Sequence, residues 1–425
     1  MVESVIKYHL GVNVIGYATG EFGGGEGLRC TLRALGSASI PFTVKNISVP
    51  WHRNLDSTYT DFSEDNPYPI NLVHINPDSL SFDSCDTQYL QKRYNIGFWA
   101  WELKKFPSNW EFAFDLFDEV WTYSSYGTEA ISEVSPIPVQ KMMPSIDLPQ
   151  PSLDREAFGL PKDKLIFLFI FDFHSVVARK NPQAVIKAFK QAFSKSNQDV
   201  LLVIKFSNGQ HHPQQRNQLY ALSEDYASIR FIDGHLTKSE VNALIYNCDC
   251  YVSLHRAEGF GLTMAEAMFY GKPVIATAYS SNTDFMNVGN SFPVKYELVT
   301  TTEDYFPYPK GSIWAEPDIA HAASLMQYVF HNYRKAQEVG ARAAEDIKSL
   351  LSPQLVGQKI RSRLEHIMGK INPSASSQIK EIEAEIDWRD SQLKAWRQTA
   401  EQAQVELEEC RKQIFLTQSQ RQIFH

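Results

Sequence analysis

Two patterns of apolar and polar positions alternate along the chain. Short runs rich in β-branched and aromatic residues predict buried strands, and the segments between them repeat apolar residues at helical spacing. An order of strand, helix and strand is typical of a parallel sheet that is covered by helices. The pattern therefore predicts an α/β fold. Strands are predicted around Trp121 and at 12–17, 69–75, 96–101, 165–171, 201–206, 229–232, 251–254 and 273–277.

One of these units indicates where a ligand would bind. The predicted strand 251–254 enters a polar elbow at 255–261, and a helical pattern follows over 262–270. Ligands of parallel sheets lie beyond the carboxyl ends of the strands. Gly259 and Gly261 let the backbone come close to a ligand, and the first amides of a helix attract an anion. The elbow is therefore a candidate phosphate site.

The same stretch carries a specific resemblance. It reads EGFGLTMAEAM, followed by GKPVIAT, and it places Glu258 and Glu266 eight positions apart. This string resembles the signature of retaining glycosyltransferase family 4 (glycosyl transferases group 1), whose two Rossmann-like domains face each other across a cleft in the GT-B fold. The alternative is that Glu258 is a helix-start carboxylate and Glu266 a solvated helix residue.

The resemblance assigns roles to residues of this stretch. It implies that Glu266 binds the ribose of the donor nucleotide and that Glu258 faces the transferred sugar as a catalytic residue. The donor diphosphate would be held by the backbone amides of Gly259, Phe260, Gly261, Leu262 and Thr263.

Basic residues earlier in the second half fit the same interpretation. Arg179 and Lys180 precede a helix predicted to begin at Pro182, and they would neutralise the charge of the leaving diphosphate. The family usually has an arginine five or six residues before this lysine, where this chain has His174 and Ser175. The alternative is that Arg179 and Lys180 are ordinary solvated residues.

Three more positions are candidates for donor binding. Lys205 is a charged residue inside the apolar run 201–206. His235 and Leu236 lie in the loop 234–236, which in the family holds the nucleotide base through backbone atoms.

The first half resembles the family more loosely. A glycine cluster at 20–27 follows the strand 12–17, and the resemblance makes Gly24 and Gly25 candidates that face the donor. The cluster lacks the register of a dinucleotide fingerprint, and a tight turn is the alternative. His74, at the end of the run 69–75, could reach the cleft on the acceptor side; the alternative is a satisfied core histidine.

An aromatic passage supplies two further acceptor-side candidates. Many family members have a histidine after the strand that corresponds to 96–101, but this chain has Trp101 and Glu102 there. The indoles of Trp99 and Trp101 offer flat faces on which a sugar can stack, and core packing is an equal alternative.

Length and proline content suggest the domain division. A chain of 425 residues is too long for one ordinary core. The proline-rich stretch 136–151 cannot hold a long helix or a central strand, so the linker is placed there. We expect an acceptor-side domain at 1–150, a donor domain at 151–352, a helix at 353–370 that crosses back to the first domain, and a tail at 374–425.

The tail has its own periodicity. Ile379, Ile386, Leu393, Ala400, Leu407 and Ile414 recur every seven residues, and in most repeats a further apolar residue lies three positions later, but not at Arg389. The pattern predicts a coiled coil that self-associates through residues 379–417. The alternative is one amphipathic helix that packs on the chain's own domains.

Composition excludes several classes of protein. The net charge of -8, without a basic arm, makes nucleic acid an unsuitable partner. No apolar run approaches the length of a membrane span and no signal peptide is recognised, so the chain is expected in the cytoplasm, with peripheral membrane contact left open. The five cysteines are scattered, and Cys248 and Cys250 have no second pair at ligand spacing, so neither disulfides nor a metal are expected.

These observations lead to an expected function. The resemblance implies a glycosyltransferase that needs no cofactor and moves a sugar from a UDP- or GDP-linked donor to a hydroxyl of a glycan, a lipid-linked glycan or a protein. The alternative is a non-catalytic scaffold that binds nucleotide sugars or glycans and assembles through its coiled coil. A third hypothesis is an epimerase with the GT-B fold.

Overall fold

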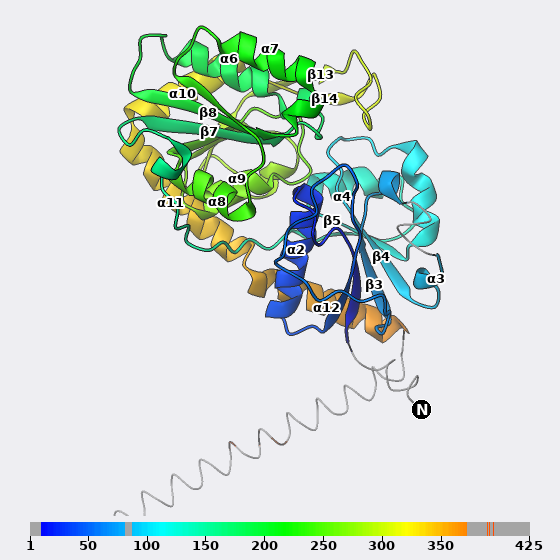
Figure 1. Cartoon of the computed structure of the whole chain (residues 1–425). Helices are drawn as coiled ribbons and strands as arrows, with labels where there is room; N and C mark the ends of the chain where they lie inside the picture. Colours follow the sequence, from blue (N-terminus) through cyan, green and yellow to red (C-terminus); the bar gives the residue numbers. More distant parts are fainter. Residues whose placement is uncertain (1–9, 81–86, 372–388, 390, 392–393, 395–425) are drawn as a thin grey trace, which may run out of the picture. The chain divides into compact units, whose positions relative to one another are not determined.

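The computed structural model describes residues 10–80, 87–371, 389, 391 and 394. It contains two parallel six-stranded sheets, with the strand orders β2-β1-β3-β4-β5-β6 and β12-β11-β10-β7-β8-β9 (Figure 1). The predicted α/β fold with two Rossmann-like sheets is confirmed. In each sheet the strand order reverses once, between β1 and β3 and between β7 and β10, and ligands of such sheets bind beside this reversal.

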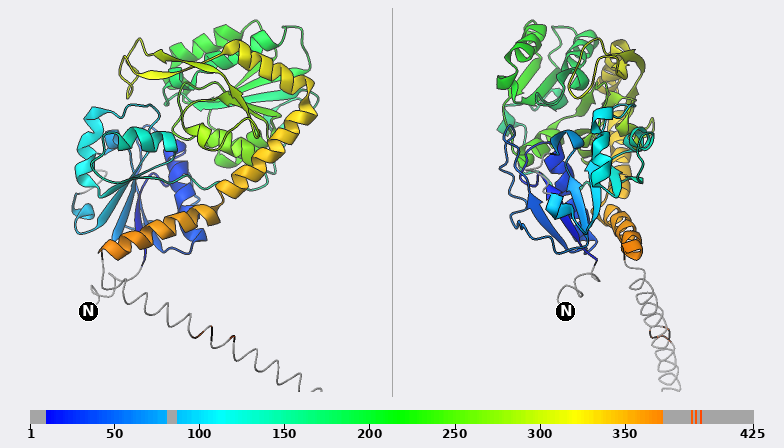
Figure 2. Two further views of the ribbon diagram at one scale, coloured as in Figure 1. Left: turned by 180° about the vertical axis from the view of Figure 1, so that it is seen from behind. Right: turned by 90° about the vertical axis from the view of Figure 1, so that its right-hand side faces the viewer.

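The first sheet and its helices form the first lobe. Helix α2 lies on one side of the sheet, and η2 with α4 lies on the other (Figure 2). The strands are β1 (Val12–Gly16), β2 (Phe42–Asn46), β3 (Ile70–His74), β4 (Tyr94–Trp99), β5 (Glu119–Thr122) and β6 (Val139–Lys141). The helices are α2 (Gly23–Ser37), η1 (Pro77–Ser79), α3 (Thr87–Leu90), η2 (Ser108–Leu116) and α4 (Ser125–Ser132).

The second sheet and its helices form the second lobe. Helices α6, α7 and α10 cover one face, and α8, α9 and α11 cover the other. The strands are β7 (Leu165–Asp172), β8 (Val200–Ser207), β9 (Ile229–Asp233), β10 (Cys250–Ser253), β11 (Val274–Thr277) and β12 (Phe292–Val294). The helices are η3 (Glu156–Phe158), α5 (Val177–Lys180), α6 (Pro182–Ala192), η4 (Gly209–His211), α7 (Pro213–Ser223), α8 (Lys238–Asn247), α9 (Leu262–Phe269), η5 (Ser281–Asp284), α10 (Ile319–His331) and α11 (Tyr333–Leu350).

Central strands of the first sheet share a buried polar ladder. Asn13, Asn71 and Asn95 are register partners on β1, β3 and β4. The side-chain amide of Asn13 donates to Asn71 Oδ1 at 2.9 Å, and that of Asn71 donates to Asn95 Oδ1 at 2.8 Å. Each amide therefore satisfies the next, so the ladder fixes the register of the three strands without leaving these groups unpaired.

A hairpin outside both sheets extends the second lobe. Its antiparallel strands are β13 (Tyr296–Thr300) and β14 (Ile313–Pro317). Trp314 and Tyr308, from the hairpin, are buried in the aromatic cluster that the first lobe builds around Trp99 and Trp101. The hairpin thus joins the cores of the two lobes.

Polar contacts also join the lobes at the amino end of α4. Ser124 and Ser281 share a hydrogen bond of 2.8 Å, and the amide of Ser125 donates to Asp284 Oδ2 at 2.7 Å. The hydroxyls of Tyr126 and Tyr279 are 2.6 Å apart. A carboxylate from the second lobe thereby completes the start of a helix in the first lobe.

The chain returns to the first lobe after α11. Helix α12 (Pro353–Ile371) places Arg361 so that it donates to Ala38 O at 2.5 Å, and Arg363 binds the buried carboxylate of Glu119 at 2.5 and 2.8 Å. The domain boundaries at 150 and 352 stay predictions. The predicted coiled coil at 379–417 lies almost entirely outside the described residues.

The glycine cluster at 20–27 enters a helix within its length, because α2 begins at Gly23. A Cβ at Gly25 would lie 2.1 Å from Gly20 O, so glycine is required there by close packing. The proline-rich stretch contains β6, which is short and lies at the edge of its sheet, where missing backbone donors are tolerated. This agrees with the prediction that the stretch holds no central strand.

Candidate active site

A cavity of about 520 Å³ lies between the lobes, a size typical of small-ligand sites. It is lined by residues that follow β1, β3 and β4 in the first lobe and β7, β8 and β10 in the second. The predicted site residues that line it are Gly24, His74, Glu102, Arg179, Lys180, Lys205, His235, Leu236, Glu258, Gly259, Phe260, Gly261, Leu262, Thr263 and Glu266.

Two predicted residues do not line the cavity. Gly25 is packed against the backbone of Gly20, as described above. Trp101 is buried among Phe106, Trp110 and Tyr308, and its indole N–H donates to Lys105 O at 3.1 Å. Trp99 is likewise part of this aromatic core, so the core-packing alternative holds for both indoles.

A buried cluster of charges surrounds Glu258. Lys180 Nζ lies 2.6 Å from one carboxylate oxygen, and Arg179 lies 3.2 Å from the other. Burial alone would raise the pKa of Glu258, but the charges of Lys180 and Arg179 outweigh it and lower the pKa to about 2. Glu258 is therefore an ionised acceptor of hydrogen bonds at neutral pH. The alternative that Arg179 and Lys180 are solvated does not hold.

The hydroxyl of Ser280 binds the backbone of the turn that carries Glu258. The hydroxyl of Ser280 accepts from the Glu258 amide at 2.9 Å and contacts its carbonyl oxygen at 3.2 Å. Gly261 adopts a φ of 97°, a conformation that favours glycine, and it precedes α9 without a side-chain cap. Leu262 and Thr263, which begin α9, line the cavity, so that their amides are available to an anion there.

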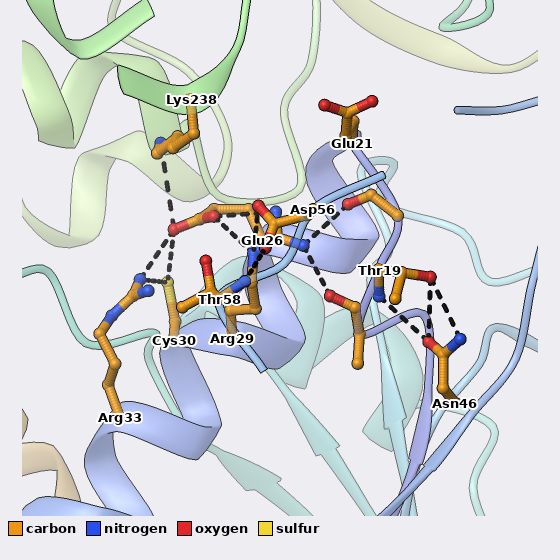
Figure 3. A network of polar contacts seen from close by, with 12 residues as sticks. Thr19, Glu21, Glu26, Arg29, Cys30, Arg33, Asn46, Asp56, Thr58 and Lys238 are labelled. Carbon is orange, nitrogen blue, oxygen red and sulfur yellow. Dashed lines mark hydrogen bonds and ion pairs between the residues drawn. The ribbon is translucent and has the colours of Figure 1, made fainter. Parts of the chain in front are cut away.

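Glu266 belongs to a second network, which the sequence did not predict. Its side chain is 2 % exposed and pairs with Lys238. Lys238 Nζ also lies 3.9 Å from Glu26 Oε1 in the first lobe, and Glu26 is bound by Arg29 and Arg33 at 3.0 and 2.7 Å. Figure 3 shows Glu26 between these three cations. Glu266 is therefore not a solvated helix residue.

The pKa shifts in this network follow from burial and from the paired charges. Burial opposes ionisation of Glu26, yet Lys238, Arg33 and Arg29 together lower its pKa to about 2. For Glu266 burial prevails over the attraction of Lys238, so its pKa is raised. Glu26 thus holds the network together as a fixed negative charge, whereas Glu266 has a single cationic partner to share with a ligand.

A basic and histidine-rich wall follows β7 and β8. Lys205 donates to Ser207 Oγ at 2.6 Å, and burial lowers its pKa to about 8, although Asp172 opposes the shift. The ring of His174 lies 5.1 Å from that of His52, which belongs to the first lobe. Among the described residues, no group of three or more His, Cys, Asp and Glu could hold a metal.

Glu102 reaches the charge cluster from the first lobe. Its Oε1 lies 3.8 Å from Arg179. Burial, together with the charge of Glu102, raises the pKa of Tyr308 of the hairpin, so that this hydroxyl stays protonated at neutral pH. Tyr308 was missed because the hairpin lies far from the recognised motif. Lys238 and Glu26 were missed because their partners are distant in sequence.

Comparisons with known proteins agree with this arrangement. Residues 152–346 match the family model of the glycosyl transferases group 1. A search of curated proteins found no match. Within the described residues, no helix combines the length and the apolar character needed to cross a membrane.

Solved structures resemble the chain at low identity. HepE of Anabaena, in complex with UDP-glucose, is 14 % identical with a TM-score of 0.60, over 84 % of this chain and 100 % of that one. The sucrose-phosphate synthase of Thermosynechococcus elongatus is 15 % identical with a TM-score of 0.63, over 85 % and 100 %. The pneumococcal O-GlcNAc transferase GtfA, in complex with UDP and GlcNAc, is 13 % identical with a TM-score of 0.50, over 70 % and 57 %.

These likenesses show the fold, which is GT-B. The family assignment rests on the sequence match, which covers the whole second sheet and the motif from Glu258 to Glu266. Residues 152–346 therefore form a domain of the glycosyl transferases group 1 family.

Proposed function

We propose that this chain is a retaining glycosyltransferase that moves a sugar from a nucleoside diphosphate sugar to a hydroxyl acceptor. The observation that carries the proposal is the meeting, in one cavity, of Lys180 and Arg179 with the uncapped start of α9. A diphosphate needs both cations and backbone donors, and the cavity offers them together.

The donor would lie mainly against the second lobe. Lys180, Arg179 and the amides of 259–263 would bind the diphosphate, with Lys205 close to the same wall. Glu266 would accept from the ribose hydroxyls, and the loop at His235 and Leu236 would hold the base. HepE was solved with UDP-glucose and GtfA with UDP and GlcNAc, which makes UDP-linked sugars the first donors to test.

The reaction needs little proton chemistry from side chains. The bond between the anomeric carbon and the diphosphate oxygen breaks, and the acceptor oxygen forms its bond on the same face. The acceptor proton passes to a phosphate oxygen of the departing diphosphate. Lys180 and the α9 amides stabilise the negative charge that grows on the leaving diphosphate. Glu258, which is ionised, faces the sugar while positive charge develops on the sugar ring.

The test begins with ligand binding. A nucleotide sugar at 100 times its dissociation constant should stabilise the protein by about 2.7 kcal/mol, so thermal shifts across UDP- and GDP-linked sugars identify the donor. Release of free nucleoside diphosphate without an acceptor then distinguishes an enzyme from a binding scaffold. With an acceptor present, proton NMR of the product reports its anomeric configuration, and inversion of that configuration contradicts the retaining assignment.

We further propose that full-length chains self-associate through residues 379–417. The support is the heptad pattern of the sequence, in which apolar residues recur over several repeats and are interrupted by Arg389.

A further inference from the structure

The histidine at the end of β3 has an unusual environment. His74 is 4 % exposed and lines the cavity, yet neither of its ring nitrogens has a hydrogen-bond partner among the described residues. The alternative of a satisfied core histidine therefore does not hold. Leaving a buried polar group unmet costs about 1 to 3 kcal/mol, so the position is unfavourable for folding alone.

The surroundings of His74 are tightly packed and largely apolar. Its ring lies 4.2 Å from that of Phe98, which stacks on Tyr123 at 4.6 Å. The backbone of His74 is closely packed as well, because a Cβ at Gly16 would lie 3.0 Å from both the Cβ and the carbonyl oxygen of His74. The imidazole thus lies against an aromatic ring, on the lining of the cavity.

The charge state of the ring restricts what it can bind. Burial lowers the pKa of His74 to about 3, so the imidazole is neutral at physiological pH. A neutral imidazole presents one N–H donor and one nitrogen acceptor. A hydroxyl both donates and accepts, so neighbouring hydroxyls can satisfy both nitrogens, whereas a phosphate or a carboxylate only accepts and leaves one nitrogen unmet.

The charges that the first lobe brings to the cavity favour a neutral acceptor. Its lining carboxylates are those of Glu21, Asp56, Asp78 and Glu102, of which Glu21 and Asp56 are paired with Arg53 and Arg29 at 3.0 and 3.4 Å. Asp78 and Glu102 would repel an anionic acceptor, whereas the cations proposed for the diphosphate belong to the second lobe. Trp51, which is 67 % exposed and lines the same cavity, adds an apolar face of the kind that sugar rings contact.

We propose that His74 is a specificity residue that binds hydroxyls of an uncharged sugar ring of the acceptor. The inference rests on the proposed function, since it names the acceptor class of the same site. The acceptor that binds in the part of the cavity beside β3 would then be a neutral glycoside, and not a phosphorylated polyol or a compound with an acidic group.

The experiment compares matched acceptors in the full-length protein. UDP-glucose and UDP-GlcNAc are the donors, and glucose, methyl α-glucoside and methyl β-galactoside are compared with glucose 6-phosphate and glycerol 3-phosphate. We expect the best neutral acceptor to exceed its phosphorylated counterpart in kcat/KM by at least about tenfold. A panel in which no neutral glycoside is the better acceptor overturns the proposal.

Variants at His74 then test the residue itself. His74→Leu removes both polar nitrogens at similar volume, and we expect the acceptor KM to rise roughly 10- to 100-fold. His74→Gln keeps a donor and an acceptor and should recover much of this loss. His331→Gln, at an exposed position on α10, is the matched control and should behave as the wild type. A loss that falls on the donor KM, or a Leu variant equal to the wild type, overturns the assignment.

Two further measurements test the proposal without relying on enzyme activity, and the first also separates it from a structural role of His74. Without ligand, His74→Leu should melt no lower than the wild type, because it removes unmet polar groups; a structural role predicts a lower Tm. In the wild type with UDP bound, the ¹⁵N resonances of the His74 ring should shift on addition of the best glycoside, and unmoved resonances contradict the proposal. Failure of the proposed function is distinguishable, since the wild type would then release no nucleoside diphosphate from any of the UDP- or GDP-linked sugars.

Discussion

A close charge pair in the cavity joins Lys180 to Glu258 at 2.6 Å. Burial lowers the pKa of Lys180 although Glu258 opposes the shift, so the amino group depends on anionic partners. We predict that Lys180→Ala lowers kcat by about 100- to 1000-fold, because the charge that Lys180 stabilises grows as the diphosphate departs. The dissociation constant of UDP should change less than tenfold, as measured by calorimetry beside the kinetics.

A lysine outside the cavity provides the control for the Lys180→Ala substitution. Lys190 on α6 pairs with Asp225 at 2.7 Å and does not line the cavity. Lys190→Ala should keep the wild-type kcat. If the loss in Lys180→Ala appeared only in the donor KM, Lys180 would contribute uniform binding and no selective stabilisation of the transition state.

The burial of His74 makes the stability of the protein depend on pH. Its pKa falls from 6.5 to about 3 on folding, so between these values the unfolded chain binds one proton more. The free energy of unfolding contributed by this group therefore decreases as the pH falls below 6.5, by up to about 1.4 kcal/mol per pH unit. His74→Leu should show a smaller decrease than the wild type in urea unfolding between pH 6.5 and 5. Equal slopes would mean that the ring is protonated in the folded protein.

At the scale of elements, the sequence predicted the buried strands well. Apolar runs such as 165–171 and 201–206 correspond to β7 and β8, because a strand covered on both faces has to be apolar throughout. The helix starts at Ser124 and Thr237 depend on neighbouring residues too, since each side chain accepts from the first turn of the helix that follows it. Both features are determined by residues that are neighbours in the sequence, so they can be predicted without knowledge of distant contacts.

Elements and partners that depend on distant contacts were not predicted. Strand β2 is only half-buried, and β13 and β14 form a hairpin whose aromatic residues pack on the other lobe. In the site, the run from Glu258 to Glu266 was recognisable as a motif, whereas its partners were not. Lys238 lies 28 positions before Glu266, and nothing in the spacing indicates that the two meet.

The hairpin leads to a prediction about stability. Trp314 is buried in the shared aromatic cluster and lies 5.4 Å from the guanidinium of Arg256, which also binds Glu316 at 2.6 Å. Trp314→Ala should lower the free energy of unfolding by about 3 to 5 kcal/mol, as expected for a large side chain removed from a core. Phe306→Ala in the same hairpin should cost less than about 0.5 kcal/mol, because Phe306 is 78 % exposed. Urea unfolding measures both, and equal effects would place Trp314 outside the core.

At the scale of the whole molecule, the two lobes share both the cavity and the contacts that join them. The inter-lobe contacts of Ser125 with Asp284 and of Lys238 with Glu26 lie on described residues before position 285. Every residue that lines the cavity precedes position 267. The catalytic unit should therefore need no part of the heptad region.

This separation predicts the effect of removing the tail. A chain cut after Ile371 keeps Arg361 and Arg363, whose bonds attach α12 to the first lobe. It should fold, transfer sugar at the wild-type rate and be a monomer by light scattering, whereas the full chain should self-associate through its apolar heptad positions. Leu407→Asp in the full chain is the matched control, since it places a charge in the apolar seam without shortening the protein. If the full chain were monomeric, or if the cut chain unfolded, the apolar positions of the tail would have to be satisfied by the chain's own lobes, and Leu407→Asp would then lower the Tm without changing the mass.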